Sequence, residues 1–156
     1  MANPFSFTAG AVLTAAQLNS IGDWTSYTPT WGGLSVGNGT VDFDYAEVNG
    51  IVIVSGRLVW GSTTSISGNV SVSVPVTAAS GQKLANGTIF RLTDASTGDR
   101  HIGGGRTSST SAMYIYAYYA ASTYTKLIDI SDGTKPFASA WTTSDEIIMS
   151  SVYQAA

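Results

Sequence analysis

The chain has 156 residues, 44% of them hydrophobic and only 11% charged, so we expect one domain with a single core and a surface covered mainly by Ser, Thr, Asn and Gly. It contains no cysteine, which excludes a disulfide framework and a cysteine-ligated metal, and its net charge of -3 comes without the Lys/Arg cluster that nucleic-acid binding requires. No apolar run reaches the length of a membrane span and the N-terminus lacks the basic region of a signal peptide, so neither a membrane nor a nucleic acid is expected as a partner.

The first predicted element is a short helix near the N-terminus. The stretch from Thr14 to Gln17 has the spacing of a capping box, in which each side chain satisfies a backbone N–H group at the helix start. Leu13 and Leu18 flank this box at the positions of a hydrophobic staple. The pattern predicts a helix from Ala15 to Gly22, since glycine can take the left-handed conformation that ends a helix.

This helix is too short to be stable alone in water, yet apolar residues surround it. We therefore interpret residues 1–31 as an anchoring arm, a short helix followed by an extended segment, that docks on a neighbouring subunit or a larger assembly. Residues 32–156 are then the domain that the arm carries. The expected anchoring residues are Phe5, Phe7, Val12, Leu13, Leu18, Ile21 and Trp24. For residues 1–8, a frayed terminus is the alternative.

From Val41 onward the apolar residues recur with a period of two, the pattern of half-buried strands. Asn49-Gly50 separates two such runs and predicts a type I′ hairpin turn. In the returning strand, from Ile51 to Trp60, Gly56 indicates a bulge or a close backbone approach. Further strands are predicted at residues 70–76, 88–92, 112–120, 124–130 and 146–153. Residues 32–40 and 94–106 are predicted as loops, with a bend or short strand at 103–105. This series of short strands predicts an all-β fold, a jelly-roll-like antiparallel β-sandwich.

The predicted strand at 112–120 has bulky side chains on both faces. Met113, Ile115, Ala117 and Tyr119 alternate with Tyr114, Tyr116 and Tyr118. Such a strand is expected to face a core on one side and a subunit contact on the other. Tyrosine rings also suit stacking on sugar rings. The candidate residues for a subunit interface or a glycan contact are Tyr114, Tyr116, Tyr118, Tyr119 and Tyr124, and both interpretations stay open.

One pattern typical of hydrolases occurs without its structural context. Gly33 to Gly37 reads G-x-S-x-G, but a hairpin is predicted after it, whereas a nucleophile elbow at Ser35 requires a helix. His101, the only histidine, would have to be the base, with Asp94 or Asp99 orienting it. A flexible loop explains the pentapeptide more simply.

Other patterns are equally unspecific. The carboxylate pairs Asp42 with Asp44 and Asp129 with Asp132 could serve glycan cleavage, but the first pair is more simply the solvated face of a strand. The run from Gly103 to Arg106 lacks the Lys-Ser/Thr of a phosphate-binding loop. We expect no enzymatic activity, no metal and no cofactor; a hydrolase built on Ser35 or a carboxylate pair is the hypothesis from another class.

The N-terminal motif can be written as F-x-x-G-x-V-L-T-A-A-x-L-N followed by W-x-x-Y-x-P-x-W. Its residues are Phe7, Gly10, Val12 to Ala16, Leu18, Asn19, Trp24, Tyr27, Pro29 and Trp31. The later matches, in order, are Gly37 to Thr40, Tyr45, Val48 to Gly50, Val70 to Val76, Pro136, Trp141, Ser144 to Glu146 and Tyr153. In these residues the chain resembles a family of small bacteriophage virion proteins of the minor tail, tail-fibre and receptor-binding type. Ser144 stands where that family usually has glycine.

The resemblance implies a structural and attachment role on the exterior of a virion. We expect a homotrimer that docks to other virion proteins through its N-terminal segment and presents the β-domain to host surface glycans. A capsid decoration or head-fibre protein is the alternative, in which the same anchor holds the capsid lattice.

Overall fold

The computed structural model describes residues 10, 12, 14–16, 21–80, 87–121, 124–131, 136–137 and 140–156, and its ordered elements are all β-strands. These are β1 (Thr25–Ser26), β2 (Trp31–Ser35), β3 (Thr40–Val48), β4 (Ile51–Val59), β5 (Ser65–Ser73), β6 (Thr88–Thr93), β7 (Arg100–Thr107), β8 (Ala112–Ala121), β9 (Tyr124–Asp129) and β10 (Glu146–Gln154). Every pairing between them is antiparallel. The prediction of an all-β antiparallel fold is confirmed.

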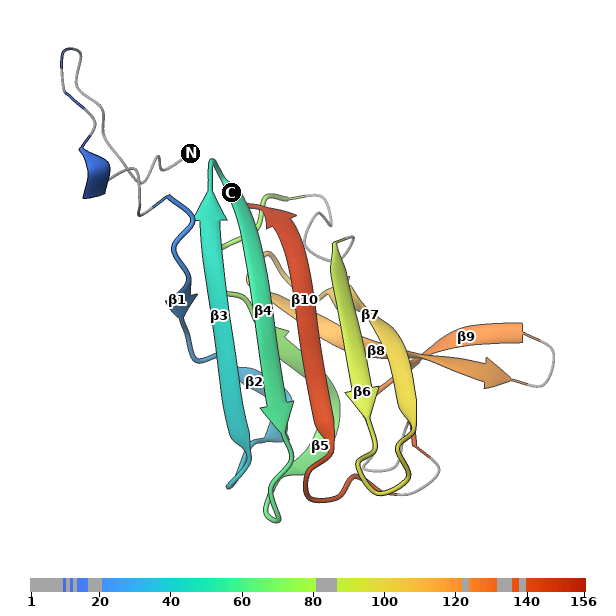
Figure 1. Cartoon of the computed structure of the whole chain (residues 1–156). Coiled ribbons are helices and arrows are strands. Elements are labelled where there is room, and N and C mark those ends of the chain that lie inside the picture. The colour runs from blue at the N-terminus through green and yellow to red at the C-terminus, as the bar shows by residue number, and fades with distance from the viewer. Residues whose placement is uncertain are drawn as a thin grey trace.

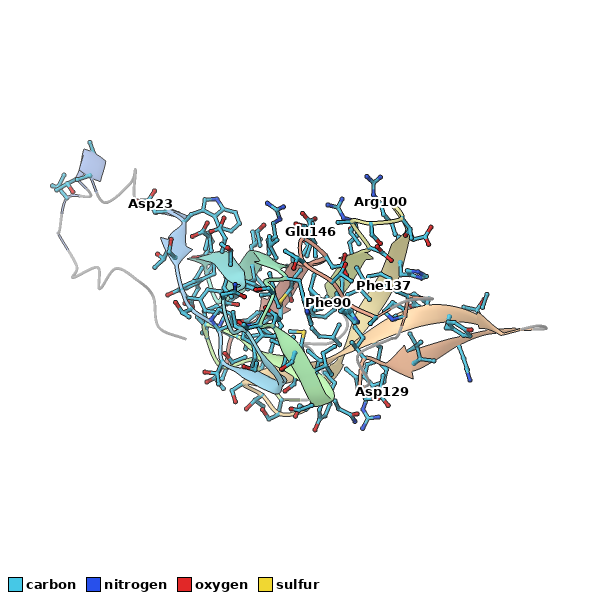
Figure 2. The ribbon with its side chains drawn as sticks, turned by 90° about the horizontal axis from the view of Figure 1, so that it is seen from below. Asp23, Phe90, Arg100, Asp129, Phe137 and Glu146 are labelled. Atoms are coloured by element: carbon cyan, nitrogen blue, oxygen red, sulfur yellow. The ribbon has the colours of Figure 1, made fainter. Side chains whose placement is uncertain are left out.

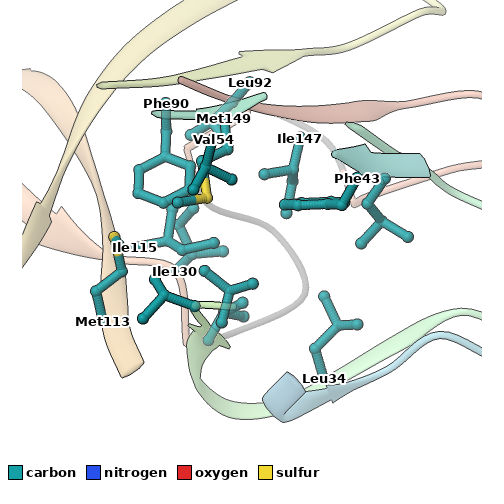
Figure 3. Close-up of a cluster of buried hydrophobic side chains, with 14 of the residues drawn as sticks. Leu34, Phe43, Val54, Phe90, Leu92, Met113, Ile115, Ile130, Ile147 and Met149 are labelled. Atoms are coloured by element: carbon teal, nitrogen blue, oxygen red, sulfur yellow. The ribbon is translucent and has the colours of Figure 1, made fainter. Parts of the chain in front are cut away.

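The strands form one sheet that curls on itself. Their order is β1-β3-β4-β10-β6-β7-β8-β5-β2, and β9 pairs with β8 outside this path. In Figure 1, β3, β4, β10 and β6 make a front layer, while β2, β5 and β8 pass behind it. The core lies between the two layers, with Phe90 and Met149 facing Met113 and Ile115 across it (Figure 3).

The predicted hairpin at Asn49-Gly50 is confirmed. β3 and β4 pair in register from Thr40↔Val59 to Val48↔Ile51, and both turn residues have a positive φ, 51° for Asn49 and 75° for Gly50. A two-residue turn of this kind matches the twist of the strands on either side. Along β4 the side chains alternate between buried and exposed positions, as a strand covered on one face requires.

Gly56 marks a close approach rather than a bulge. It pairs with Phe43 on one side and Met149 on the other without a shift in register. A Cβ atom at this position would collide with the ring of Phe43, which lies over the backbone of Gly56. The absence of a side chain therefore makes room for an aromatic ring of the core.

Residues 27–30 cross from one end of the curled sheet to the other, since the two end strands, β1 and β2, follow each other in the chain. On one side the Tyr27 N–H donates to the carbonyl of Phe43 at 2.9 Å; on the other the Ser73 N–H donates to the carbonyl of Thr30 at 2.9 Å. The rings of Tyr27 and Trp31 both pack edge-on against Phe43, with centroids 5.7 Å and 5.9 Å away. This crossing segment closes the sheet, so residues 25–31 of the predicted anchoring arm also contact the domain.

The prediction of loops at 32–40 and 94–106 is wrong in part. β2 covers Trp31–Ser35, where glycines interrupt the alternation of side chains, and it pairs with β5 through a register shift between Gly32 and Leu34. β7 covers Arg100–Thr107, and a Cβ on its Gly103 would collide with the carbonyl oxygen of Tyr116. Both strands are stabilised by pairing with distant neighbours, which overrides their weak local preference.

The helix predicted from Ala15 to Gly22 falls largely outside the described residues. Ala15 and Ala16 have helical backbone and Ile21 and Gly22 form a turn, whereas residues 17–20 are not described, so the helix stays a prediction. Gly22 has a φ of 80°, the left-handed conformation expected there. In the described ranges we find no helix long and apolar enough to cross a membrane.

Candidate functional site

The β8–β9 hairpin extends beyond the rest of the sheet. β8 pairs with β5 over residues 112–114 and with β7 as far as Ala117, but residues 118–121 pair with β9 alone. We call these residues together with 124–127 of β9 the hairpin arm. Figures 1 and 2 show it reaching away from the two layers, with Asp129 near its base.

The tyrosines of β8 lie on both faces of this strand. Tyr114 and Tyr116 are half-buried and share the outer face with Tyr118, which is 51% exposed. Tyr119 follows the core-facing positions of the strand, but it lies beyond the core and is 43% exposed. The side chain of Tyr124 lies outside the described residues. The structure therefore brings Tyr114 and Tyr116 to the sheet and Tyr118 and Tyr119 to the hairpin arm.

Tyr116 lies between two charged residues, Arg106 and Asp129, that the sequence analysis did not connect with it. The carboxylate of Asp129, its cross-strand partner in β9, lies near its hydroxyl. The guanidinium of Arg106 lies 5.8 Å from the centre of its ring. Burial raises the pKa of Tyr116, and the nearby carboxylate of Asp129 raises it further. The register of the hairpin, had it been known, would have placed Asp129 opposite Tyr116.

A second exposed apolar surface lies on the outer face of the front layer. Ile53 pairs with Val152, Ile89 pairs with the neighbouring Ser150, and Ile102 pairs with Arg91 one step further across the sheet. Ile89 and Ile102 are each 60% exposed. We call this diagonal surface the outer apolar band; its members are Ile51, Ile53, Val152, Ile89 and Ile102.

The described anchoring residues are also exposed. Val12 is 86% exposed, Trp24 is 56% exposed and Ile21 is 46% exposed. Trp24 directly precedes β1, so the N-terminal segment leaves the domain at the edge of the sheet. Phe5, Phe7, Leu13 and Leu18 lie outside the described residues.

An aromatic stack occupies one end of the core. Trp60 and Trp141 stack with ring centroids 4.5 Å apart, Phe137 packs against Trp141, and His101 lies 5.6 Å from Phe137. An open cavity of about 250 Å³ adjoins the two indoles; it is lined by Trp60, Thr64, Ser65, Ile66, Ala140 and Trp141. His101 is thus a packing partner of an aromatic ring, and the described residues include no group of three side chains suited to hold a metal ion.

Two of the hydrolase candidates, Ser35 and Asp94, lie at a strand end and in a turn, where their contacts serve the fold. Ser35 ends β2 and is followed by a turn into β3, not by the helix of a nucleophile elbow. Asp94 accepts hydrogen bonds from Ser96 and Thr97, which lower its pKa and shape the turn before β7. These contacts give Asp94 a turn-forming role.

The carboxylate pairs show no catalytic arrangement in the part of the chain that is described. Asp42 and Asp44 share the outer face of β3, where Asp44 accepts a hydrogen bond from Ser26 at 2.6 Å. Asp132, the partner suggested for Asp129, lies outside the described residues.

Comparison with known proteins adds no assignment, because no family model, curated protein or solved structure matches the chain.

Proposed function

We propose that the protein is a phage virion protein of the tail-fibre or receptor-binding type, which docks to the particle through its N-terminal segment and presents its β-domain to the host. The observation that carries this proposal is the exposure of Trp24, Ile21 and Val12 beside a domain that already has a complete core. Exposed apolar side chains gathered in one segment are expected where another molecule covers them. The resemblance of the N-terminal motif to that of small phage virion proteins supports the same role.

The domain suits the exterior of a particle. We propose a jelly-roll-like sandwich as the finer description of the fold, which the two layers of its curled sheet support. The outward-facing residues of β5 include Ser65, Ser67 and Asn69, so hydroxyl and amide groups rather than charges keep this surface soluble. We propose a homotrimer, with other virion proteins as partners of the N-terminal segment.

Host attachment would use the outer face of β8. Tyr116 presents an aromatic ring beside a guanidinium and a carboxylate, a combination that can stack on a sugar ring and hydrogen-bond its hydroxyl groups. This surface is the proposed contact for a surface glycan of the host.

The decisive experiment measures how much of the protein is present in purified particles, by quantitative mass spectrometry against the major capsid protein. A few trimers per particle would support the tail location. A copy number near one per capsid subunit would make the protein a capsid decoration or head-fibre protein, and absence from the particles would refute a virion role.

Variants test the anchor itself. Removing residues 1–22 leaves β1 and the crossing segment in place, so the domain should fold but should be lost from particles. Trp24→Ser should also lower the amount of the protein that is incorporated into particles. Asp23→Asn, a change at the exposed position next to Trp24, is the matched control and should leave incorporation unchanged. Full incorporation of the truncated chain would contradict the proposal.

A further inference from the structure

We propose that the outer sides of β6 and β7 bind an anionic polysaccharide, whose carboxylate or phosphate groups are held by arginine side chains. This inference deepens the proposed glycan contact at Tyr116 and rests on it, because it names the chemistry of the glycan and the strands beside β8 that take part. We call this surface the arginine face. Its residues are Ile89 and Arg91 of β6 and Arg100, Ile102, Gly104 and Arg106 of β7.

The register of the sheet brings three arginines to this face. Arg91 pairs with Ile102, and Arg100 and Arg106 lie two and four positions from Ile102 along β7. Because side chains alternate between the two sides of a strand, all three arginines point outward, and all three are exposed. His101, between them in sequence, packs inward against the aromatic stack. The cluster is a property of the folded sheet, since the arginines are well separated along the chain.

The arginine face concentrates positive charge in an acidic protein. The chain has a net charge of -3, yet β6 and β7 contain three arginines and no acidic residue. The neighbouring carboxylates are Glu146 of β10, which pairs with Arg57, and Asp99 in the turn before β7. Within the described residues, no hydrogen bond or ion pair engages the three guanidinium groups, although Arg106 lies beside the ring of Tyr116. These groups can therefore bind an anion from outside.

Between the arginines the surface is apolar and open. Ile89 and Ile102 are each 60% exposed, and a Cβ added to Gly104 would meet no described atom within 4 Å. Gly104 pairs with Ile89 on one side and with Tyr116 on the other, so the open position lies between an aliphatic side chain and an aromatic ring. A sugar ring has apolar C–H faces and hydroxyl groups at its rim, so it can lie on a floor of this kind.

The spacing of the arginines fits an extended ligand. At roughly 3.3 Å per residue and about 5 Å between strands, the Cα atoms of Arg91 and Arg100 are about 8 Å apart and those of Arg100 and Arg106 about 20 Å apart. A guanidinium can donate two parallel hydrogen bonds to one carboxylate or phosphate. A small anion would reach only part of the face, whereas a chain of sugar rings with repeated acidic groups would reach all three arginines.

A nucleic-acid strand also carries repeated phosphates, but the arginine face suits it less well. Proteins bind unpaired bases by stacking them on aromatic side chains. The outward side chains between the arginines are isoleucines, and the aromatic ring of β6, Phe90, is buried in the core. An acidic polysaccharide uses both the charges and the apolar floor.

The test uses purified full-length protein without particles or host cells. A failure here would leave the result of the particle-incorporation experiment standing, and absence of the protein from particles would leave a measured polysaccharide contact standing. The two proposals can therefore fail separately.

The experiment measures binding by biolayer interferometry to four immobilised probes. They are polygalacturonate, which has a carboxylate on each ring, a phosphorylated mannan, neutral dextran and a single strand of oligodeoxythymidine. The variants are Arg91→Gln, Arg100→Gln, Arg106→Gln and Gly104→Val, which fills the open position. Lys126→Gln, on the hairpin arm, makes the same change in net charge and is the matched control. All five positions lie on the surface of strands, and circular dichroism checks that each variant folds.

We expect binding to polygalacturonate or to the phosphorylated mannan and none to dextran; the stronger of the two identifies the acidic group. Each arginine variant should bind about tenfold more weakly, and Gly104→Val should lose binding to at least this extent. Lys126→Gln should stay within about twofold of the unchanged chain. Added salt should weaken binding, since it screens charges at the surface.

Four results would overturn the proposal: no binding to either acidic polysaccharide, equally strong binding to oligodeoxythymidine, unchanged binding of Gly104→Val, or a loss with Lys126→Gln equal to that with the arginine variants. The second result would assign the face to nucleic acids, and the last would show a response to net charge without a defined site.

Discussion

Replacing Gly56 with alanine tests how the crossing segment is held on the sheet. The ring of Phe43 lies over Gly56 and is 2% exposed. The same ring is packed on its other sides by Tyr27 and Trp31, the residues at the two ends of the crossing segment. A methyl group at position 56 would push the ring outward, and the ring could move only by disturbing both of these contacts.

The cost can be estimated from these contacts. Adding a methyl group to a well-packed core costs about 1–3 kcal/mol. Each edge-on aromatic pair contributes about 0.5–1.5 kcal/mol beyond its buried area, and both pairs would be weakened. We expect Gly56→Ala to lower the free energy of unfolding by roughly 2–4 kcal/mol, which for a domain of this size lowers the melting temperature by roughly 5–15 °C.

Urea unfolding followed by tryptophan fluorescence measures this loss, with Gly104→Ala as the matched control. Gly104 lies in β7 of the same sheet, and a Cβ there would meet no atom within 4 Å. Its replacement should change stability by less than about 1 kcal/mol and in the stabilising direction, because glycine is unfavourable in a strand. Equal effects of the two changes would refute the reasoning. Adding Phe43→Leu to Gly56→Ala should recover part of the loss, as a double-mutant cycle can show.

Three further predictions concern stability. Asp145→Ala should cost about 3 kcal/mol in thermal unfolding, because the buried carboxylate accepts the N–H groups of Thr142 at 2.6 Å and Ala95 at 2.8 Å; a loss below about 1 kcal/mol would contradict this. Ser144→Gly should raise the free energy of unfolding in urea by about 0.5–1 kcal/mol, since Ser144 has a φ of 77°, whereas Ser144→Ala should bring no gain. Burial raises the pKa of Tyr153 from 10.0 to about 12. The fold therefore favours the protonated phenol, and up to about 3 kcal/mol of stability, complete below pH 10, is lost between pH 10 and about 12. Urea unfolding across this range checks the slope, which Tyr153→Phe should reduce.

The parts of the fold that could be predicted are those set by local sequence. The hairpin at Asn49-Gly50 follows from two residues that accept a positive φ between alternating strands. β2 and β7 could not be predicted in the same way, because their glycines provide no alternation. The reason for a glycine at position 103 is visible only when β8 lies beside β7, because the missing side chain allows the carbonyl of Tyr116 to approach.

The candidate surfaces were predictable to a similar extent. The alternation along β8 correctly separated the buried Met113 and Ile115 from Tyr116 on the opposite face. It could not show that Tyr119 lies beyond the core, because that depends on where β7 ends relative to β8. The partners of Tyr116, Arg106 and Asp129, come from two other strands, and their register is a property of the assembled sheet.

The position of β10 has a consequence for how the chain reaches its folded state. This strand follows all the others in sequence, yet it lies between β4 and β6 and pairs with both. Until it is inserted, the edges of β4 and β6 are open and Phe90 lacks its cross-strand neighbour Met149. Contacts so distant in sequence form slowly, and open edges favour association between chains. During synthesis, therefore, the unfinished sheet has its greatest tendency to aggregate just before its central strand arrives.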